Sequence, residues 1–271
     1  MYELNYDKLS SLKALDLMAS KSECVEVSLP DIDDNSSDME VLDYIMIFVC
    51  TRLKSVKSVF KGGYVLMKIM PDMARYSHDI DFSISEKEQY ELVKQVLDEL
   101  GSSLVSLKVI DSYEIKDTIE HNKSGGIKLH RSGFDKQDLG IDIGLHDLSF
   151  GIQEWNILGI DVEKFTVERM LSDKISAIFS KKRFRRTKDL YDFYILTSSC
   201  KNINIDKLRE FLELREINWD TTPFDPIVLR EYGKAYDKLN IKNHTGKILY
   251  KPEFSECMNI LKEYVAVIRG V

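Results

Sequence analysis

Residues 76–84 have the sequence YSHDIDFSI, and this stretch predicts a β-strand with two carboxylates on one face. Because successive side chains of a strand point to opposite sides, Asp79 and Asp81 face one way, and Ile80 and Phe82 face the other way, into a core. Two carboxylates at this spacing repel each other unless a hard cation such as Mg2+ lies between them. The pattern indicates phosphate chemistry, and its alternative is a solvated strand end without a metal.

Two glycines precede this strand, at the point where an apolar run meets a helix-like segment over residues 64–70. Gly62 and Gly63 follow Lys61 there. Paired glycines let the backbone approach a phosphate closely, and the helix start after them offers free N–H groups to an anion. A simple strand-to-helix turn is the alternative interpretation.

A third carboxylate lies in another short strand, residues 139–144, with the sequence LGIDIG. Leu139, Ile141 and Ile143 alternate toward a core, so Asp142 faces the opposite way. If the two strands are neighbours, Asp142 completes a cluster with Asp79 and Asp81. An acid within an apolar strand is costly unless it is exposed or liganded.

The order of these segments resembles the AbiEii/AbiGii toxin family of nucleotidyltransferases over residues 56–196. The matching elements are Lys61-Gly62-Gly63, Arg75-x-Ser77-x-Asp79-Ile80-Asp81-Phe82, Ile141-Asp142-Ile143, Glu168-x-x-Leu171-x-x-Lys174 and Lys188-Asp189-Leu190-Tyr191-Asp192. The sequence departs from the family in two places. Tyr64 replaces a small hydroxyl residue near the expected nucleotide, and Lys188 replaces an arginine, which keeps the charge but loses the planar fork.

The resemblance implies an α+β fold: a nucleotidyltransferase-type mixed β-sheet flanked by helices, like that of polymerase β, followed by a mostly helical C-terminal domain. It implies transfer of a nucleoside monophosphate from an NTP to an acceptor, in some relatives the 3′ end of tRNA, within a toxin–antitoxin or abortive-infection system. The implied catalytic residues are Asp79, Asp81, Asp142, Lys174 and Asp189. Asp79, Asp81 and Asp142 would bind Mg2+ or Mn2+, and Lys61, Gly62, Gly63, Arg75 and Ser77 would bind the nucleotide.

Lys174 stands out without the resemblance. A helix is predicted over residues 167–180, and Lys174 falls within its inward apolar stripe, so it must extend to solvent or meet an anion. Asp189 lies near the start of the next predicted helix, residues 187–196. There it has either a catalytic role or the favourable interaction of an acid with the helix dipole.

Between these helices, residues 181–188 contain six basic side chains and one aromatic ring. Such a run is a solvated loop, or it binds a triphosphate or an RNA backbone. The whole chain has a formal charge of −7, yet residues 1–165 carry 18 basic against 30 acidic side chains and residues 166–271 carry 20 against 15. A basic second half suits a polyanionic acceptor.

A chain of 271 residues can bury two cores, and we predict a nucleotidyltransferase domain over residues 1–165 and a helical bundle over residues 166–271 that contributes Lys174 and Asp189. In the first half, helices are predicted over residues 1–20, 40–57 and 86–100, and strands and loops over 105–130. After Asp161 the pattern is mostly helical, including residues 208–214 and 254–267, with a loop around residues 222–226.

We expect a cytoplasmic protein without a membrane span or signal peptide. The four cysteines are far apart in the sequence, which favours reduced thiols over structural zinc. His78 is expected to pack rather than to catalyse.

Two other classes of function stay open at this point. One is transfer to a small molecule or a protein, and the other is a non-catalytic binding module. The family also implies an antitoxin partner.

Overall fold

The computed structural model of the chain describes residues 28–119, 124–133, 136–215, 217, 219 and 223–270. Residue contacts divide the chain into Met1–Pro30 and Asp31–Val271, and the description below concerns the second unit. The helix predicted over residues 1–20 lies outside the described residues.

A mixed seven-stranded sheet runs through this unit in the order β3-β4-β5-β2-β1-β7-β6. Its strands are β1 (Ser58–Lys61), β2 (Asp79–Ile84), β3 (Ser112–Thr118), β4 (Ser124–His130), β5 (Leu139–Leu145), β6 (Ile152–Ile157) and β7 (Ile160–Phe165). β2 pairs in parallel with β5, and β1 pairs in parallel with β7, whereas the other neighbours are antiparallel. The strand that carries Asp79 and Asp81 is therefore central.

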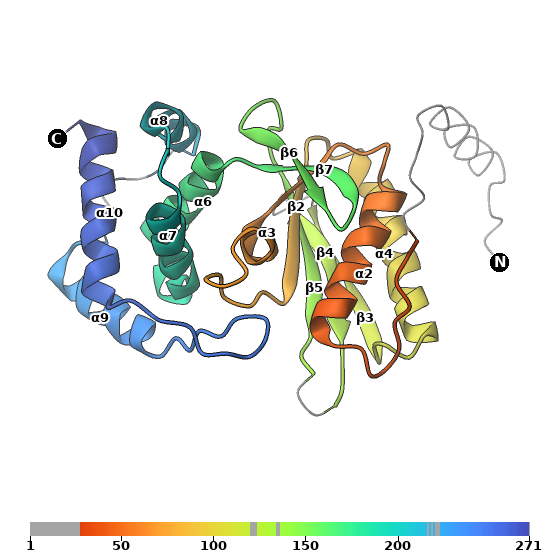
Figure 1. Ribbon diagram of the computed structural model, residues 1–271. Coiled ribbons are helices and arrows are strands. Elements are labelled where there is room, and N and C mark those ends of the chain that lie inside the picture. The colour runs from red at the N-terminus through yellow and green to blue at the C-terminus, as the bar shows by residue number, and fades with distance from the viewer. Residues whose placement is uncertain are drawn as a thin grey trace. The chain divides into compact units, whose positions relative to one another are not determined.

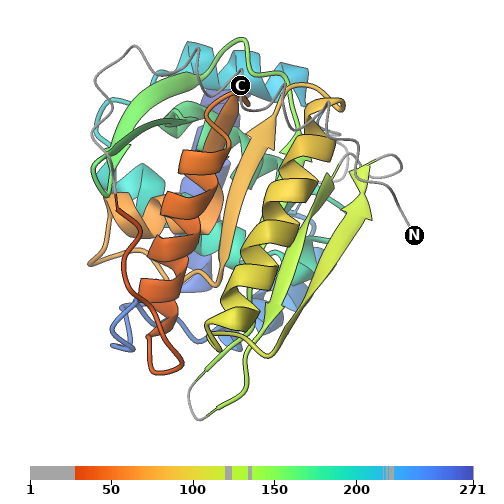
Figure 2. The same cartoon turned by 90° about the vertical axis from the view of Figure 1, so that its right-hand side faces the viewer.

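Helices cover both faces of the sheet (Figure 1). The helices before residue 165 are α2 (Asp38–Arg52), α3 (Gly62–Ile69) and α4 (Gln89–Ser106). The later helices are α6 (Val167–Phe179), α7 (Thr187–Ser199), α8 (Ile205–Leu214), α9 (Pro226–Asp237) and α10 (Phe254–Arg269), with a short 3-10 helix, η1 (Arg183–Arg185). α2 and α4 lie side by side on one face (Figure 2), and α3 lies on the other face, toward α6 and α7.

The alternation predicted for β2 is confirmed. Ile80 and Phe82 are buried on the side of α2, whereas Asp79 is exposed and Asp81 is partly exposed on the opposite side. The Phe60 and Phe82 rings contact each other across β1 and β2, with centroids 5.6 Å apart. Sheet and helices share one hydrophobic cluster, which includes side chains from both sides of residue 165. The boundary predicted there falls between β7 and α6, and the division into two domains stays a prediction.

The hairpin of β6 and β7 differs from the prediction of mostly helical structure after Asp161. Ile157 pairs with Ile160, so only Leu158 and Gly159 form the turn, and both have positive φ values, 53° and 79°. Such a turn commonly has asparagine or aspartate at its first position. Leucine at that position conceals the turn in the sequence.

Several helix boundaries also differ from the predicted ones. α2 ends at Arg52 rather than near residue 57, and α4 continues to Ser106. The loop predicted around residues 222–226 is present at residues 223–225; α9 begins at Pro226, where the Asp225 side chain accepts hydrogen bonds from the backbone N–H groups of Ile227 and Val228. Proline at the first helical position after an aspartate cap is a favourable helix start.

The predicted α+β class is confirmed by this mixed sheet and its flanking helices. None of the helices within the described ranges is long and apolar enough to span a bilayer. Cys50, Cys200 and Cys257 are free thiols.

Candidate active site

A row of side chains crosses five neighbouring strands on the face of the sheet that carries Asp81. Lys61 pairs in register with Asp81, Asp81 with Asp142, Asp142 with Gly126, and Gly126 with Lys116. Paired positions of adjacent strands place side chains on the same face. Two carboxylates therefore lie side by side in the middle of the row, with a lysine toward each end. The predicted cluster required the strand of Asp142 to be a neighbour of the strand of Asp81, and β5 does pair with β2.

The turn from β1 into α3 requires its glycines. Gly62 has φ +77°, and a Cβ atom there would lie 2.0 Å from Asp81 Oδ2. A Cβ atom on Gly63 would lie 2.6 Å from Ser77 Oγ. No side chain caps the N-terminus of α3, so backbone N–H groups beside these carboxylates are available to an anion.

The two carboxylates of β2 ionise less readily than a free aspartate. Burial raises the pKa of Asp81 from 3.8 to about 6; Lys61 lowers it, and Asp142 raises it further. Burial and the nearby Asp142 also raise the pKa of Asp79. These raised pKa values reflect burial first and the neighbouring acid Asp142 second.

Lys174 meets two carboxylates rather than extending to solvent. Its Nζ donates to Asp189 Oδ1 at 2.9 Å and to Asp192 Oδ2 at 2.7 Å. Burial lowers the pKa of Lys174, but Asp192 and Asp189 more than offset this effect, and the pKa is raised. Lys174 is therefore a charged, fixed cation that links α6 to α7.

Asp192 is a residue of this network for which the sequence analysis gave no role. The guanidinium of Arg75 donates from Nε and Nη2 to its two carboxylate oxygens, both at 3.0 Å, and from Nη1 to the carbonyl of Tyr76. Asp192 is 1% exposed, and although burial raises its pKa, Lys174 and Arg75 lower it below the usual value. A buried acid between Tyr191 and Phe193 could have signalled a required partner, because unpaired buried charges are rare.

One cavity of about 420 Å³ brings the predicted residues together. All ten of them line it: Lys61, Gly62, Gly63, Arg75, Ser77, Asp79, Asp81, Asp142, Lys174 and Asp189. Three side chains of the basic run, Arg185, Arg186 and Lys188, line the same cavity, whereas Arg183 is buried. The basic run is therefore not only a solvated loop. We call this space the carboxylate cavity.

A second cavity, of about 550 Å³, lies on the side of β3, β4 and β5. It shares Lys61, Asp81 and Asp142 with the carboxylate cavity. Its other charged lining groups are Lys116 and Arg215. We call it the β-side cavity.

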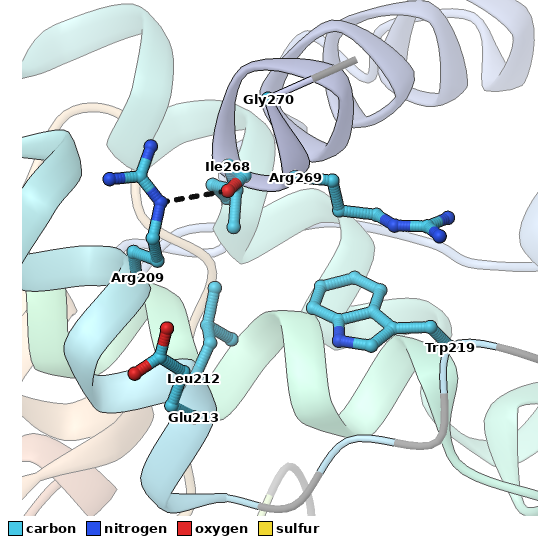
Figure 3. Close-up of a pocket in the computed structure, with 7 residues that line it drawn as sticks. All are labelled: Arg209, Leu212, Glu213, Trp219, Ile268, Arg269 and Gly270. Atoms are coloured by element: carbon cyan, nitrogen blue, oxygen red, sulfur yellow. Dashed lines mark hydrogen bonds between the residues drawn. The ribbon is translucent and has the colours of Figure 1, made fainter.

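A third cavity, of about 470 Å³, lies between the ends of α8 and α10 (Figure 3). Arg209 Nε donates to the Ile268 carbonyl at 2.8 Å, and the Arg269 guanidinium lies 5.9 Å from the centre of a Trp219 ring. None of the ten predicted residues lines this cavity.

The profile of the family described as nucleotidyl transferase AbiEii toxin, type IV toxin–antitoxin system, matches residues 51–258. The chain belongs to the AbiEii family. It is a nucleotidyltransferase, so the alternative of a non-catalytic binding module is set aside.

Solved structures of similar fold include two that match most of this AbiEii-family chain. MenT4, the nucleotidyltransferase toxin Rv2826c of Mycobacterium tuberculosis H37Rv, is 16% identical with a TM-score of 0.54, and the match covers 86% of this chain and 85% of MenT4. JHP933 of Helicobacter pylori is 18% identical with a TM-score of 0.52, and 86% of this chain and 92% of JHP933 are covered. At these identities the likeness concerns the fold. Among curated proteins, none matches the sequence significantly.

Tyr64, the departure from the AbiEii pattern after the two glycines, lies away from both cavities. It is fully buried, and its hydroxyl donates to Asp43 Oδ1 at 2.9 Å, on α2. The hydrogen bond directs this hydroxyl to α2, and Tyr64 lines neither cavity; its proximity to the nucleotide stays a prediction. His78 packs edge-on against Tyr76, with ring centroids 4.5 Å apart, as expected, although it also lines the carboxylate cavity.

The acids of β2 and β5 have the donor chemistry of a divalent cation site, since Mg2+ and Mn2+ prefer carboxylate oxygens. The Asp81 carboxylate leans toward Gly62, and the Asp79 carboxylate leans toward Gly140 on the other neighbouring strand. In the part of the chain that the structure describes, no three acidic, histidine or cysteine side chains are close enough to share one ion. Metal binding by Asp79, Asp81 and Asp142 stays a prediction, and it requires these side chains to rotate toward one another.

Proposed function

We propose that this chain transfers a nucleoside monophosphate from an NTP to a terminal hydroxyl of RNA, as the toxin of a toxin–antitoxin pair, with Mg2+ or Mn2+ held by Asp79, Asp81 and Asp142. The observation that carries the proposal is the carboxylate cavity. It combines these acids, an uncapped helix N-terminus and a basic rim in one space. That combination suits a triphosphate whose charge is shared between a metal ion and the protein.

The triphosphate would be bound by groups on two sides of the carboxylate cavity. Backbone N–H groups at Gly62 and Gly63 would face its oxygens, and Arg185, Arg186 and Lys188 would supply positive charge. Lys174 is held by Asp189 and Asp192, so its charge is partly used within the protein. We therefore assign Lys174 mainly to positioning Asp189 at the cavity wall.

The reaction would proceed by attack of an acceptor hydroxyl oxygen on the α-phosphorus. The bond from that phosphorus to the bridging oxygen breaks, and pyrophosphate leaves with the electron pair. The proton of the hydroxyl passes to a carboxylate. Asp142 suits this step better than Asp189, because its side chain is 54% exposed, whereas Asp189 is 13% exposed and accepts a hydrogen bond from Lys174.

A bound divalent cation would neutralise charge on the phosphate oxygens and lower the pKa of the attacking hydroxyl. Asp79 and Asp81 would hold it from β2. Burial and the neighbouring acids raise the pKa values of both carboxyl groups, so a bound cation would stabilise their ionised forms. The remaining catalytic contribution is positioning and charge stabilisation by fixed groups.

The test is incubation of the purified protein with Mg2+, total cellular RNA and each α-labelled NTP in turn. Wild type, Asp81→Asn and a control variant, Asp72→Asn, are compared. Asp72 is exposed in the segment between α3 and β2 and lines none of the three cavities. We expect label in a tRNA-sized band with wild type and Asp72→Asn, and none with Asp81→Asn.

Label that survives RNase treatment would instead identify a protein or small-molecule acceptor. Transfer retained by Asp81→Asn would refute the assignment of the metal ligands. We further propose that the reaction takes place in the cytoplasm, where NTPs and tRNA are available, and that an antitoxin neutralises the chain, as its family's name implies.

A further inference from the structure

We infer that the β-side cavity holds the terminal nucleotide of the acceptor strand, with Lys116 and Arg215 as its phosphate contacts, and that the carboxylate cavity holds the NTP. This inference rests on the proposed function and assigns its two substrates to two separate spaces.

The two cavities adjoin at the same acids. Asp81 and Asp142 line both, and so does Lys61. In phosphoryl transfer the attacking and leaving oxygens are roughly in line through the phosphorus. If pyrophosphate leaves toward the basic rim of the carboxylate cavity, the acceptor must arrive from the other side of the shared acids. The β-side cavity is the second space that these acids line, and the basic rim of Arg185, Arg186 and Lys188 does not line it.

Two glycines of β4 lie beside the polar groups of the β-side cavity, and Gly125 lines it. Gly126 stands between Lys116 and Asp142 in the row across the sheet, so no side chain separates them. A Cβ atom on Gly126 would lie 1.9 Å from the Ile141 carbonyl oxygen, and one on Gly125 would lie 2.1 Å from Tyr90 Oη. The backbone of β4 therefore approaches its neighbours too closely for any larger residue.

The charges of the β-side cavity are arranged to accept an anion. Lys116 Nζ lies 3.4 Å from Asp142 Oδ1, and their side chains are 43% and 54% exposed. A long, exposed ion pair of this kind contributes little to stability, so Lys116 can exchange Asp142 for a phosphate at small cost. This exchange would also release Asp142 for the metal and for the acceptor hydroxyl.

Arg215 supplies the second cation, from the end of α8. It pairs with Asp173 of α6 and is 26% exposed. His146, which also lines the cavity, adds no charge at neutral pH, because burial together with Lys61 and Arg215 lowers its pKa to about 3. The positively charged groups that line the cavity are therefore Lys116, Arg215 and Lys61, and Asp173 offsets part of the charge of Arg215.

The test separates the two substrates by their kinetics. Initial rates of RNA labelling are measured against RNA concentration at saturating NTP, and against NTP concentration at saturating RNA. Lys116→Met should raise the KM for RNA about tenfold, as expected for one phosphate contact of about 1.4 kcal/mol, and leave the KM for NTP within about twofold. Lys188→Met, on the rim of the carboxylate cavity, should show the opposite pattern.

Lys128→Met is the matched control. Lys128 lies on β4, is 42% exposed and pairs with Asp138, much as Lys116 pairs with Asp142, but it lines neither cavity. Both KM values should stay unchanged in this variant. Lys116→Met should also reduce the slope of the logarithm of the RNA KM against the logarithm of salt concentration by about one, and Lys128→Met should not.

Labelled RNA with an unchanged RNA KM in Lys116→Met would refute this inference and leave the proposed function intact. A rise in the NTP KM instead would also refute it, because it would place the nucleotide in the β-side cavity. If wild type labels no RNA, the proposed function fails, and this inference falls with it. Equal melting temperatures of the Lys116→Met and Lys128→Met variants would establish that folding does not explain the difference.

Discussion

Replacing Asp81 by asparagine should stabilise the metal-free protein while it abolishes transfer. Burial raises the pKa of this carboxyl group from 3.8 to about 6, even though Lys61 lowers it. A tenfold change in an ionisation constant corresponds to about 1.4 kcal/mol, so keeping Asp81 ionised at neutral pH costs the fold on the order of 3 kcal/mol. Asparagine has the shape of the protonated acid and no charge, and most of this cost should be recovered.

The assay is urea unfolding in EDTA between pH 7.5 and pH 4, with Asp72→Asn as the control. At pH 7.5 the free energy of unfolding of Asp81→Asn should exceed that of wild type by about 2 kcal/mol, which allows for relaxation around the partly exposed side chain. Because the pKa of Asp81 is raised on folding, wild type gains stability as the pH falls from above 6 to below 3.8. The advantage of the variant should therefore shrink toward pH 4.

Equal or lower stability of Asp81→Asn at pH 7.5, or an advantage that does not change with pH, would refute the reasoning. Addition of Mg2+ provides a second readout in the same experiment. A ligand that binds only the folded state stabilises it, so Mg2+ should raise the stability of wild type and leave Asp81→Asn unchanged.

Three other substitutions test separate parts of the structure. Asp192→Asn should lower the free energy of unfolding by about 3 kcal/mol in urea titrations at pH 7, because it leaves two buried cations short of an anion; since the pKa of Asp192 is lowered on folding, the loss should diminish only below about pH 4. Gly62→Ala should reduce kcat more than tenfold, which corresponds to at least about 1.4 kcal/mol of activation free energy, because its methyl group would collide with the Asp81 carboxylate. An unchanged kcat in the RNA-labelling assay would contradict the tight turn. Tyr64→Phe should cost about 1 kcal/mol of stability through the lost hydrogen bond to Asp43, without changing the relative kcat/KM for the four NTPs.

The parts of the site that could be predicted from sequence are those fixed by local periodicity. Alternation along β2 places Asp79 and Asp81 on one face whatever surrounds the strand, and alternation along β5 does the same for Asp142. The paired glycines at the start of α3 indicate that the backbone closely approaches another group there. These local features single out the acids of the two strands and the paired glycines, whereas Arg75, Ser77 and Asp189 were assigned through the resemblance to the AbiEii/AbiGii family; all of them are among the residues that line the carboxylate cavity.

The parts that could not be predicted depend on contacts between distant segments. Arg75 and Asp192 are separated by 117 positions, and nothing in either segment specifies the other. The direction of Tyr64 depends on how α3 is rotated against the sheet, which is set by packing rather than by the preceding glycines. The turn at Leu158 was missed because a leucine with positive φ has no sequence signal.

The buried charges around Asp192 have a consequence for dividing the chain. Arg75 precedes the central strand in the sequence, whereas Lys174 and Asp192 belong to helices that follow the last strand, β7. A truncated gene product that stops after β7 would keep the acids of β2 and β5 but would lose Lys174 and Asp189, and it would leave the Arg75 guanidinium without its carboxylate. Separately expressed halves would therefore have to reassemble before either could work, which makes this chain suited to a split-protein complementation assay in which toxicity reports reassembly.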